Sequence, residues 1–383
     1  MLTCAFGGSD SVRYVQINAY SGAWAESIVF GKHYELIANG DESWVFWARG
    51  NHAQDEHMQK IASYPEVCLD ALLSRIDGKA GFHSKRITRR LLKKLDEINP
   101  DVMHLHILIG YYLNVEMLFE WLAKHRCKVL WTLHDCWAFT GHCIHFAYAG
   151  CDQWRTHCGA SKGCPQTNTY PESFSKSSVV SNFEKKRRLF TMLPPERMTL
   201  IAPSQWLADL AKQSFLGKYE ICVRYNEIDK EVFKPTPSNI RERIGVDNRF
   251  MILGVASKWS EHKGLSDFLA LANDLDCNIY AVAVVGVNDK QSRDAPANLI
   301  TLPRTKNATE LAKLYSAADV FFNPTVEDNY PTVNLEAEAC GTDVVTYDTG
   351  GCRETIFRSG SYVVSSYEEA VHAIEFLRNK NDK

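Results

Sequence analysis

Short apolar runs alternate with longer stretches in which apolar residues recur at helical spacing. Runs such as VRYVQI at 12–17 predict buried strands, and the stretches between them predict helices that lay an apolar face on the sheet. Strands are predicted at 12–17, 43–48, 101–105, 128–133, 199–204, 250–255, 278–286, 299–305, 318–322 and 343–347. Helices are predicted at 26–36, 83–99, 114–124, 205–214, 265–273, 309–317, 332–340 and 367–377. This alternation is typical of an α/β fold with parallel sheets.

The alternation is interrupted between Tyr225 and Pro237, where turn-forming residues accumulate in NEIDKEVFKPTP. A chain of 383 residues is also too long for one compact core and suits two domains. We predict an acceptor-side domain at 1–225, a second domain at 226–365, and a C-terminal helix and tail at 366–383. Each domain is expected to be a doubly wound, Rossmann-like sheet that binds ligands at the carboxyl ends of its strands.

The composition is that of an ordinary globular protein, with 45% hydrophobic and 23% charged residues. A net charge of −3 argues against a general affinity for polyanions, so nucleic acid is not an expected partner. The first ten residues lack the basic start and apolar core of a signal peptide, and polar residues break the apolar stretch at 103–119. These features predict a cytoplasmic protein whose twelve cysteines are reduced.

The segment NPTVEDNYPTVNLEAEACG at 323–341 carries the strongest candidate chemistry. It predicts a strand end, a polar loop, and a helix that begins near Thr332 and is capped by Gly341. Such an arrangement turns free backbone N–H groups towards a ligand, and Asp328 and Glu336 flank those groups. The alternative is an ordinary strand-to-helix turn whose acids are solvated.

Other polar residues also fall where predicted strands end. His104, His106 and His134 end two strands of the first domain, which favours a site over a purely structural role. Lys258 and Lys263 lie in the loop ASKWSEHKG between a strand and a helix, where two cations are suitably placed for a diphosphate.

These segments resemble the retaining family 4 glycosyltransferases, which have the two-domain GT-B fold. In that family two acids separated by seven residues precede an E-A-x-A-C-G helix, and here Asp328 stands in place of the first glutamate. HLHILIGYYLN, TLHDCWAFTG and Lys263-Gly264 also match the family, while Lys258 takes the place of its arginine and loses the bidentate fork. The resemblance extends from about residue 13 to residue 362.

The resemblance implies roles for individual residues. The catalytic set is His134, Asp328, Glu336 and Lys263. The donor is bound by Gly22, Lys258, Lys263, Arg304, Asp328, Asn329, Tyr330, Pro331, Thr332, Val333 and Glu336. The acceptor side is shaped by His106, Gly110 and Asn114. Transfer in this family needs no metal ion.

The predicted helix at 83–99 places lysines and arginines around an apolar stripe, which leaves a basic outer face. One interpretation is a solvated helix surface. The other is docking on anionic lipid, which suits enzymes that act on lipid-linked acceptors at the inner face of the membrane. The run KKRR at 185–188 is a second candidate for such a contact.

Four cysteines cluster in GHCIHFAYAGCDQWRTHCGASKGCP. Cys143, Cys151, Cys158 and Cys164 could supply the four sulfur ligands of a structural zinc ion. Their spacing contains no CxxC pair, so reduced packing thiols or a disulfide are alternatives.

We therefore predict a retaining glycosyltransferase that moves a hexose-type sugar from a nucleotide-diphosphate donor to a saccharide acceptor, lipid-linked in our interpretation, during surface polysaccharide biosynthesis. The E-D-N-x-P loop resembles that of family members that build capsules and exopolysaccharides. A non-hydrolysing nucleotide-sugar epimerase and a non-catalytic carbohydrate-binding relative are the alternatives.

Overall fold

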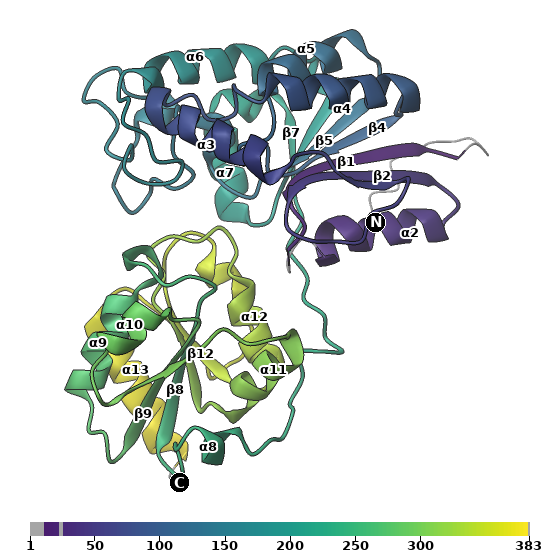
Figure 1. The fold of residues 1–383 in the computed structure, drawn as a ribbon. Coiled ribbons are helices and arrows are strands. Elements are labelled where there is room, and N and C mark those ends of the chain that lie inside the picture. The colour runs from purple at the N-terminus through teal and green to yellow at the C-terminus, as the bar shows by residue number, and fades with distance from the viewer. Residues whose placement is uncertain (1–10, 23–25, 382–383) are drawn as a thin grey trace. The chain divides into compact units, whose positions relative to one another are not determined.

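The structure, a computed structural model, describes residues 11–22 and 26–381 (Figure 1). The chain divides into two units, one of residues 1–203 and 207–224 and one of residues 204–206 and 225–383. The change of unit at Tyr225 falls where the turn-forming residues interrupt the sequence pattern. Residues 366–381, predicted as a separate helix and tail, belong to the second unit. Part of the predicted loop at 18–25 lies outside the described residues.

The first unit is built on a parallel sheet of seven strands in the order β3-β2-β1-β4-β5-β6-β7. The strands are β1 (Arg13–Tyr20), β2 (Glu42–Arg49), β3 (Met58–Lys60), β4 (Val102–Leu105), β5 (Lys128–Thr132), β6 (Met198–Ala202) and β7 (Glu220–Val223). The strand order reverses between β1 and β4. In open α/β sheets this reversal opens a crevice at the carboxyl ends of the strands, where ligands bind.

Helices cover the sheet of the first unit. They are α2 (Gly31–Ala38), α3 (Tyr64–Asp77), α4 (Lys85–Ile98), α5 (Val115–Lys124), α6 (Ser178–Phe190) and α7 (Gln205–Gln213). The apolar spacing that predicted α4 is confirmed, because Ile87, Leu91 and Leu95 are buried on one side of this helix. None of the described helices is long and apolar enough to cross a membrane.

Helix α3 was not predicted, yet its ends carry strong local signals. Ser63 and Glu66 form a capping box, in which the Glu66 carboxylate accepts a hydrogen bond from the Ser63 N–H at 3.0 Å. Pro65 stands in the first turn, and Gly78 ends the helix with a φ of 72°. The prediction missed it because only three of its residues, Val67, Asp70 and Ser74, are buried, and two of them are polar.

The second unit holds a parallel sheet of six strands in the order β10-β9-β8-β11-β12-β13, which reverses between β8 and β11. The strands are β8 (Phe250–Val255), β9 (Tyr280–Val285), β10 (Leu299–Leu302), β11 (Val320–Asn323), β12 (Asp343–Tyr347) and β13 (Tyr362–Val364). The helices are α8 (Ile240–Arg243), α9 (Leu265–Asp274), α10 (Asp289–Arg293), α11 (Ala308–Ala317), α12 (Thr332–Ala339) and α13 (Tyr367–Asn381).

Both faces of this second sheet are covered by apolar cores. Ile252 of β8 points into one core with Phe268 of α9 and Ile374 of α13. Its neighbour Leu253 points into the other core with Leu314 of α11. Successive strand residues alternate between the two cores, as the period of two requires. This double burial explains why the strands of the second unit are continuous apolar runs that the sequence pattern identified.

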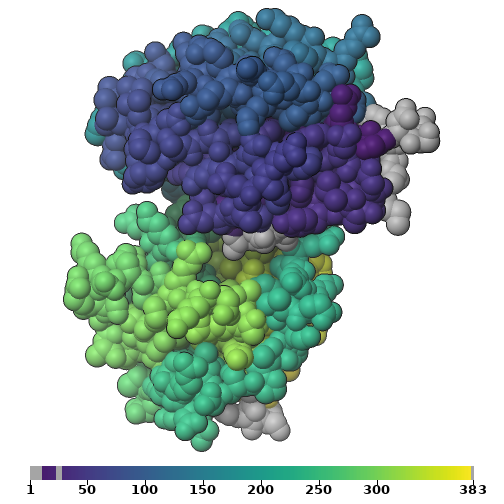
Figure 2. Space-filling view, turned by 45° about the vertical axis from the view of Figure 1, so that its right-hand side comes forward, coloured from purple at the N-terminus to yellow at the C-terminus, as the bar shows by residue number. Residues whose placement is uncertain are grey.

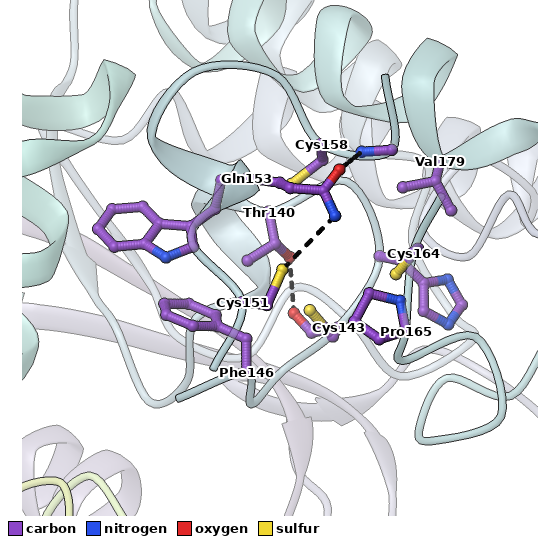
Figure 3. Close-up of a pocket in the computed structure, with 12 residues that line it drawn as sticks. Thr140, Cys143, Phe146, Cys151, Gln153, Cys158, Cys164, Pro165 and Val179 are labelled. Atoms are coloured by element: carbon purple, nitrogen blue, oxygen red, sulfur yellow. Dashed lines mark hydrogen bonds between the residues drawn. The ribbon is translucent and has the colours of Figure 1, made fainter. Parts of the chain in front are cut away.

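The four clustered cysteines of the first unit line one pocket of about 270 Å³ (Figure 3). Each thiol, however, has its own surroundings. The Cys143 and Cys164 thiols are hydrogen-bonded to each other, whereas the Cys158 sulfur accepts from the backbone N–H of Gly141. The Gln153 amide donates to the Cys151 sulfur at 3.9 Å.

Among the described residues, no group of three or more histidine, cysteine, aspartate or glutamate side chains is placed to hold a metal ion. All four of these cysteines are free thiols. Whether they bind zinc stays a prediction.

We expect Cys164 to react selectively with an alkylating agent. The Cys143 thiol donates to the Cys164 sulfur and lowers the pKa of Cys164 to about 7, whereas burial raises the pKa of Cys158 to about 12. Mass spectrometry after iodoacetamide treatment at neutral pH should find Cys164 labelled and Cys158 unlabelled. In Cys143→Ala the reaction at Cys164 should slow and move to higher pH; an unchanged pH profile would contradict the assigned hydrogen bond.

Candidate functional site

The predicted loop at 325–331 joins β11 to α12 at the carboxyl end of β11, next to the strand-order reversal of the second sheet. The helix begins at Thr332, as the sequence predicted. The loop therefore lies at the position where doubly wound sheets bind ligands.

Backbone packing on two sides holds this loop. Gly264, at the start of α9, approaches so closely that a Cβ there would lie 2.4 Å from the Pro324 carbonyl oxygen. Gly350 has a φ of +57°, and a Cβ there would lie 2.0 Å from the Asp328 carbonyl oxygen. Only glycine fits at these positions, so the loop is clamped between the turn before α9 and the turn after β12.

Hydrogen bonds connect the same three segments. The Val326 N–H donates to the His262 carbonyl at 3.1 Å, and the Gly351 N–H donates to the Asp328 carbonyl at 2.9 Å. The Thr349 hydroxyl donates to the Thr325 carbonyl at 2.7 Å. Because these bonds satisfy backbone groups that water would otherwise solvate, the loop has one defined conformation.

Lys263 and Asp328 form an ion pair within this clamp. The Lys263 Nζ lies 2.6 Å from Asp328 Oδ2, and the two side chains remain 37% and 24% exposed. Burial lowers the pKa of Lys263, but the Asp328 carboxylate outweighs this effect and the pKa is raised overall. Lys263 is therefore a positioned cation that stays protonated and is still reachable by a ligand.

Glu336 lies on α12, about one turn after its start, and is half-buried. Burial raises the pKa of Glu336, while a hydrogen bond donated by the Tyr315 hydroxyl to Oε2 at 3.1 Å opposes the rise. An ionised carboxylate that is partly shielded from water has lost some of its hydration. Hydrogen bonds from the hydroxyl groups of a ligand therefore stabilise it more than they stabilise a fully solvated carboxylate.

The predicted donor residues 329–333 occupy different positions around the start of α12. The N–H of Tyr330 donates to Asp328 Oδ1 at 3.2 Å, so this predicted ligand donor is used within the loop. The Tyr330 ring is buried and stacks on Tyr225. Thr332 and Val333 are the first residues of α12, where N–H groups have no acceptor in their own helix. Asn329 and Pro331 are buried next to them.

Three predicted donor residues are exposed near the ends of strands. Gly22 follows β1, Lys258 follows β8, and Arg304 follows β10. Lys258 lies five residues before Lys263, but only Lys263 is paired with Asp328. The two predicted diphosphate lysines thus have different environments.

In the first unit, His106 and His134 come together in a hollow of about 230 Å³ at the ends of β4 and β5. Nδ1 of His106 lies 3.3 Å from Nε2 of His134, and Nε2 of His106 lies 3.3 Å from Oε1 of Gln16. Burial lowers the pKa of His134 to about 4 and the pKa of His106 well below its usual value. Both imidazoles are therefore neutral at neutral pH.

The hydrogen bonds define which ring nitrogens carry protons. The Gln16 amide nitrogen donates to the Val29 carbonyl at 2.8 Å, so its oxygen is directed to His106 as an acceptor. Nε2 of His106 must then be protonated, and its Nδ1 accepts from the protonated Nε2 of His134. In the neutral ring this leaves Nδ1 of His134 with a lone pair.

Three other candidates of the first unit, whose predicted roles stay predictions, make contacts within the fold. His104 is enclosed by the Tyr14 and Thr132 hydroxyls, each 2.8 Å from a ring nitrogen. The Asn114 side chain caps α5 by accepting from the Met117 N–H at 3.0 Å, and its amide donates to the Phe82 carbonyl. Gly110 allows close approach, because a Cβ there would lie 2.7 Å from that of Ala19.

Some residues that build the site were not identified from the sequence. Gln16 sets the histidine tautomers, and Tyr315 holds Glu336. Neither belongs to a motif, and their roles depend on contacts between segments that are distant in the chain. For Tyr315 the only signal was its helical position in α11, which marks it as a core residue.

Comparison with known proteins agrees with this fold. Residues 238–383 match the family described as glycosyl transferases group 1. The chain is 27% identical to the colanic acid biosynthesis glycosyl transferase WcaC of Escherichia coli K12, in an alignment that covers 84% of this chain and 76% of the relative.

Solved structures resemble the whole chain. The sucrose-phosphate synthase of Thermosynechococcus elongatus aligns with a TM-score of 0.67 at 13% identity and covers 96% of this chain and 89% of that protein. The Anabaena protein Alr3699/HepE, solved in complex with UDP and glucose, aligns with a TM-score of 0.60 at 15% identity over 97% and 91%. The family match over residues 238–383, the similarity to WcaC along most of the chain and the two parallel sheets together support a glycosyltransferase with the GT-B fold.

Proposed function

We propose that the chain is a retaining glycosyltransferase that moves a hexose-type sugar from a nucleoside diphosphate donor to a saccharide acceptor. The observation that carries this proposal is the Lys263–Asp328 pair on a loop clamped at the strand-order reversal of the second sheet, followed by the half-buried Glu336 on α12. The complexes of Alr3699/HepE with UDP and with UDP-glucose support a donor of this class.

Each group of the second unit has a chemical task in this proposal. Glu336 accepts hydrogen bonds from the ribose hydroxyls, which replace the water that its carboxylate has lost. Asp328 and the N–H groups at the start of α12 hold the sugar. When a sugar hydroxyl binds Asp328, the charge of Lys263 is less neutralised and becomes available to the diphosphate.

The departing phosphate gathers negative charge as the glycosidic bond breaks. Lys263, with Lys258 and nearby N–H groups, stabilises that charge in the way a divalent ion does elsewhere. We propose that transfer needs no metal ion and that the acceptor hydroxyl attacks from the face that the phosphate leaves. The phosphate then takes the hydroxyl proton. His134 positions the sugar and does not act as the base.

The acceptor assignment is drawn from the relative. Because WcaC is named for colanic acid biosynthesis, we propose that this chain contributes to a surface polysaccharide and that its acceptor is lipid-linked. Such an acceptor requires the enzyme to work at the inner face of the membrane, so we also propose cytoplasmic localisation with a peripheral membrane contact.

The proposal is tested first by a thermal-shift screen of nucleotide-sugars, since a ligand far above its dissociation constant stabilises by a few kcal/mol. The stabilising donor is then incubated with and without saccharide acceptors, in the presence and absence of EDTA. Transfer that depends on acceptor and resists EDTA supports the proposal. A new nucleotide-sugar formed without acceptor would instead identify an epimerase, and binding without any turnover would identify a non-catalytic relative.

We expect Asp328→Asn to shift the alkaline limb of the pH–rate profile to lower pH. The Asp328 carboxylate raises the pKa of Lys263, and without it burial lowers that pKa, so Lys263 loses its proton earlier as the pH rises. Turnover at neutral pH should also fall about ten-fold or more because a charged hydrogen bond is lost. The control Lys258→Gln removes an exposed cation and should keep the position of the alkaline limb. An unshifted profile in Asp328→Asn would refute the role of the pair.

We expect Glu336→Gln to stabilise the protein while it weakens donor binding. The raised pKa of Glu336 means that its ionised form opposes folding. Below the ordinary glutamate pKa both folded and unfolded states are protonated, so the effect is absent; it develops as the pH rises through the raised pKa. Urea unfolding should therefore show a stability gain at neutral pH that disappears in acid.

Glu338 provides the matched control for this substitution. Its carboxylate accepts from the N–H groups of Phe357 and Arg358 and from the Ser361 hydroxyl at 2.9, 3.1 and 2.7 Å. Glu338→Gln should therefore destabilise, by about 1–3 kcal/mol for the donors left unsatisfied. Equal destabilisation by both substitutions would show that Glu336 is a structural acid and not a ligand-binding one.

We expect Gln16→Leu to lower transfer without weakening donor binding. The substitution removes the acceptor that defines the tautomer of His106 and, through it, that of His134. His134→Ala should lower turnover at least as much. The control Thr132→Val removes a hydrogen-bond partner of His104, the histidine outside this chain of bonds, and should affect stability more than transfer. Full transfer by Gln16→Leu would exclude a role for the tautomer.

A further inference from the structure

The outward side of α3 is apolar. Leu69, Leu72, Leu73 and Ile76 have exposed fractions of 57%, 56%, 40% and 56%. Their spacing of three, four and seven residues places them on one side of the helix, and we call this set the α3 stripe. A contiguous apolar surface of this kind on a water-soluble protein marks an interaction site.

The stripe belongs to a well-formed helix. The opposite side of α3 is anchored by buried Val67, Asp70 and Ser74, and the Ser74 hydroxyl donates to the Asp70 carboxylate at 2.9 Å. The capping box at Ser63 and the left-handed Gly78 fix both ends. The residues of the α3 stripe therefore face away from the first unit, because other residues of α3 occupy the buried side of the helix.

A loop from elsewhere in the chain adds a protruding aromatic ring to the same surface. Phe174 is 74% exposed, and its N–H donates to the Arg75 carbonyl of α3 at 2.8 Å. The Arg75 guanidinium lies 5.3 Å from the centre of the Phe174 ring. The apolar surface thus continues from the α3 stripe across Arg75 to Phe174.

A row of cations runs alongside. Arg86, Arg89, Arg90 and Lys93 are exposed on α4. Arg90 reaches Glu66 of α3, with 2.9 Å between its guanidinium and the carboxylate, so the basic side of α4 borders α3. Figure 2 shows the segment that contains both helices, in indigo and blue, on the surface of the first unit.

Three of the acidic groups around this surface are paired. Glu66 pairs with Arg90, Glu172 pairs with Arg75, and Asp77 pairs with His83. Cations therefore remain in excess beside the apolar stripe. The second basic run of the sequence is different, because Lys186 is buried and both Lys185 and Arg188 pair with Glu116.

We propose that the α3 stripe, together with Phe174 and the basic side of α4, docks on the surface of an anionic lipid bilayer. The apolar side chains enter the boundary between headgroups and acyl chains, and the cations contact anionic headgroups. The excess of positive charge around an apolar centre favours such a bilayer over a second copy of this chain, whose same surface would be equally basic. The proposal extends the peripheral contact of the proposed function, but it is tested without donor or acceptor, so failure of transfer does not affect it.

The test is co-sedimentation of the full chain with vesicles of phosphatidylcholine that contain or lack phosphatidylglycerol. We expect binding that requires phosphatidylglycerol and weakens with salt. The combined variant Leu69→Ser, Leu72→Ser and Ile76→Ser should lower binding at least about ten-fold, since each leucine or isoleucine loses apolar burial in the bilayer. The pair Arg86→Gln and Lys93→Gln should lower binding about five-fold for each charge removed.

The control is Ile37→Ser, which removes an apolar residue of 46% exposure from α2 and should leave vesicle binding unchanged. All variants should keep the thermal midpoint of the unchanged protein, because exposed substitutions of this kind alter stability little. Equal sedimentation of the stripe variant and the unchanged protein would overturn the proposal. A dimer in light scattering that the stripe variant abolishes, without vesicle binding, would also overturn it and identify the α3 stripe as an interface between copies.

Discussion

The close approach of backbone to backbone around residues 324–331 is the constraint on which the proposed donor-side chemistry depends. Gly264 and Gly350 each occupy a position where a side chain would collide with a carbonyl of this loop. Because glycine backbone packs directly against the backbone of this loop, the position of Asp328 is restricted. The adjoining turn at Gly264 follows Lys263 directly, so the same contact that fixes the acid also fixes the cation.

The candidate residues of the two units differ in whether they are charged at neutral pH. In the second unit Lys263 is held against Asp328, which raises the pKa of the lysine, so Lys263 keeps its charge at neutral pH. In the first unit burial lowers the pKa values of His106 and His134, so both rings are neutral. These rings can orient their partners through hydrogen bonds only. A fixed cation suits the stabilisation of a departing phosphate, and neutral rings suit the orientation of uncharged hydroxyls.

The sequence was most informative where residues are buried on both sides of a sheet or fixed in a local motif. The strands of both sheets other than the edge strands β3, β7 and β13 followed from patterns along the chain. So did the start of α12 at Thr332 and the clustering of His106 with His134. Where a role depends on contacts between distant segments, no pattern along the chain marks it, as for Gln16 and Tyr315. The Asn114 side chain caps α5 and donates to the Phe82 carbonyl, contacts that only the three-dimensional structure reveals.

The cysteine pocket shows a different limit of sequence reasoning. Four thiols within a short segment suggested a tetrahedral ion, and the fold did bring all four to one pocket. Coordination also requires that the sulfurs point at one place, and the Cys151 and Cys158 sulfurs accept hydrogen bonds from Gln153 and Gly141. The residue types in a segment predict which side chains lie close together better than they predict where each side chain points.

The second sheet is covered on both faces by side chains from residues that follow Tyr225, including those of α13. Its interior therefore needs no contribution from the other half of the molecule. Substitutions in the first half can therefore accumulate without disturbing this interior, so evolution can alter one half of the chain while the other is inherited as a block.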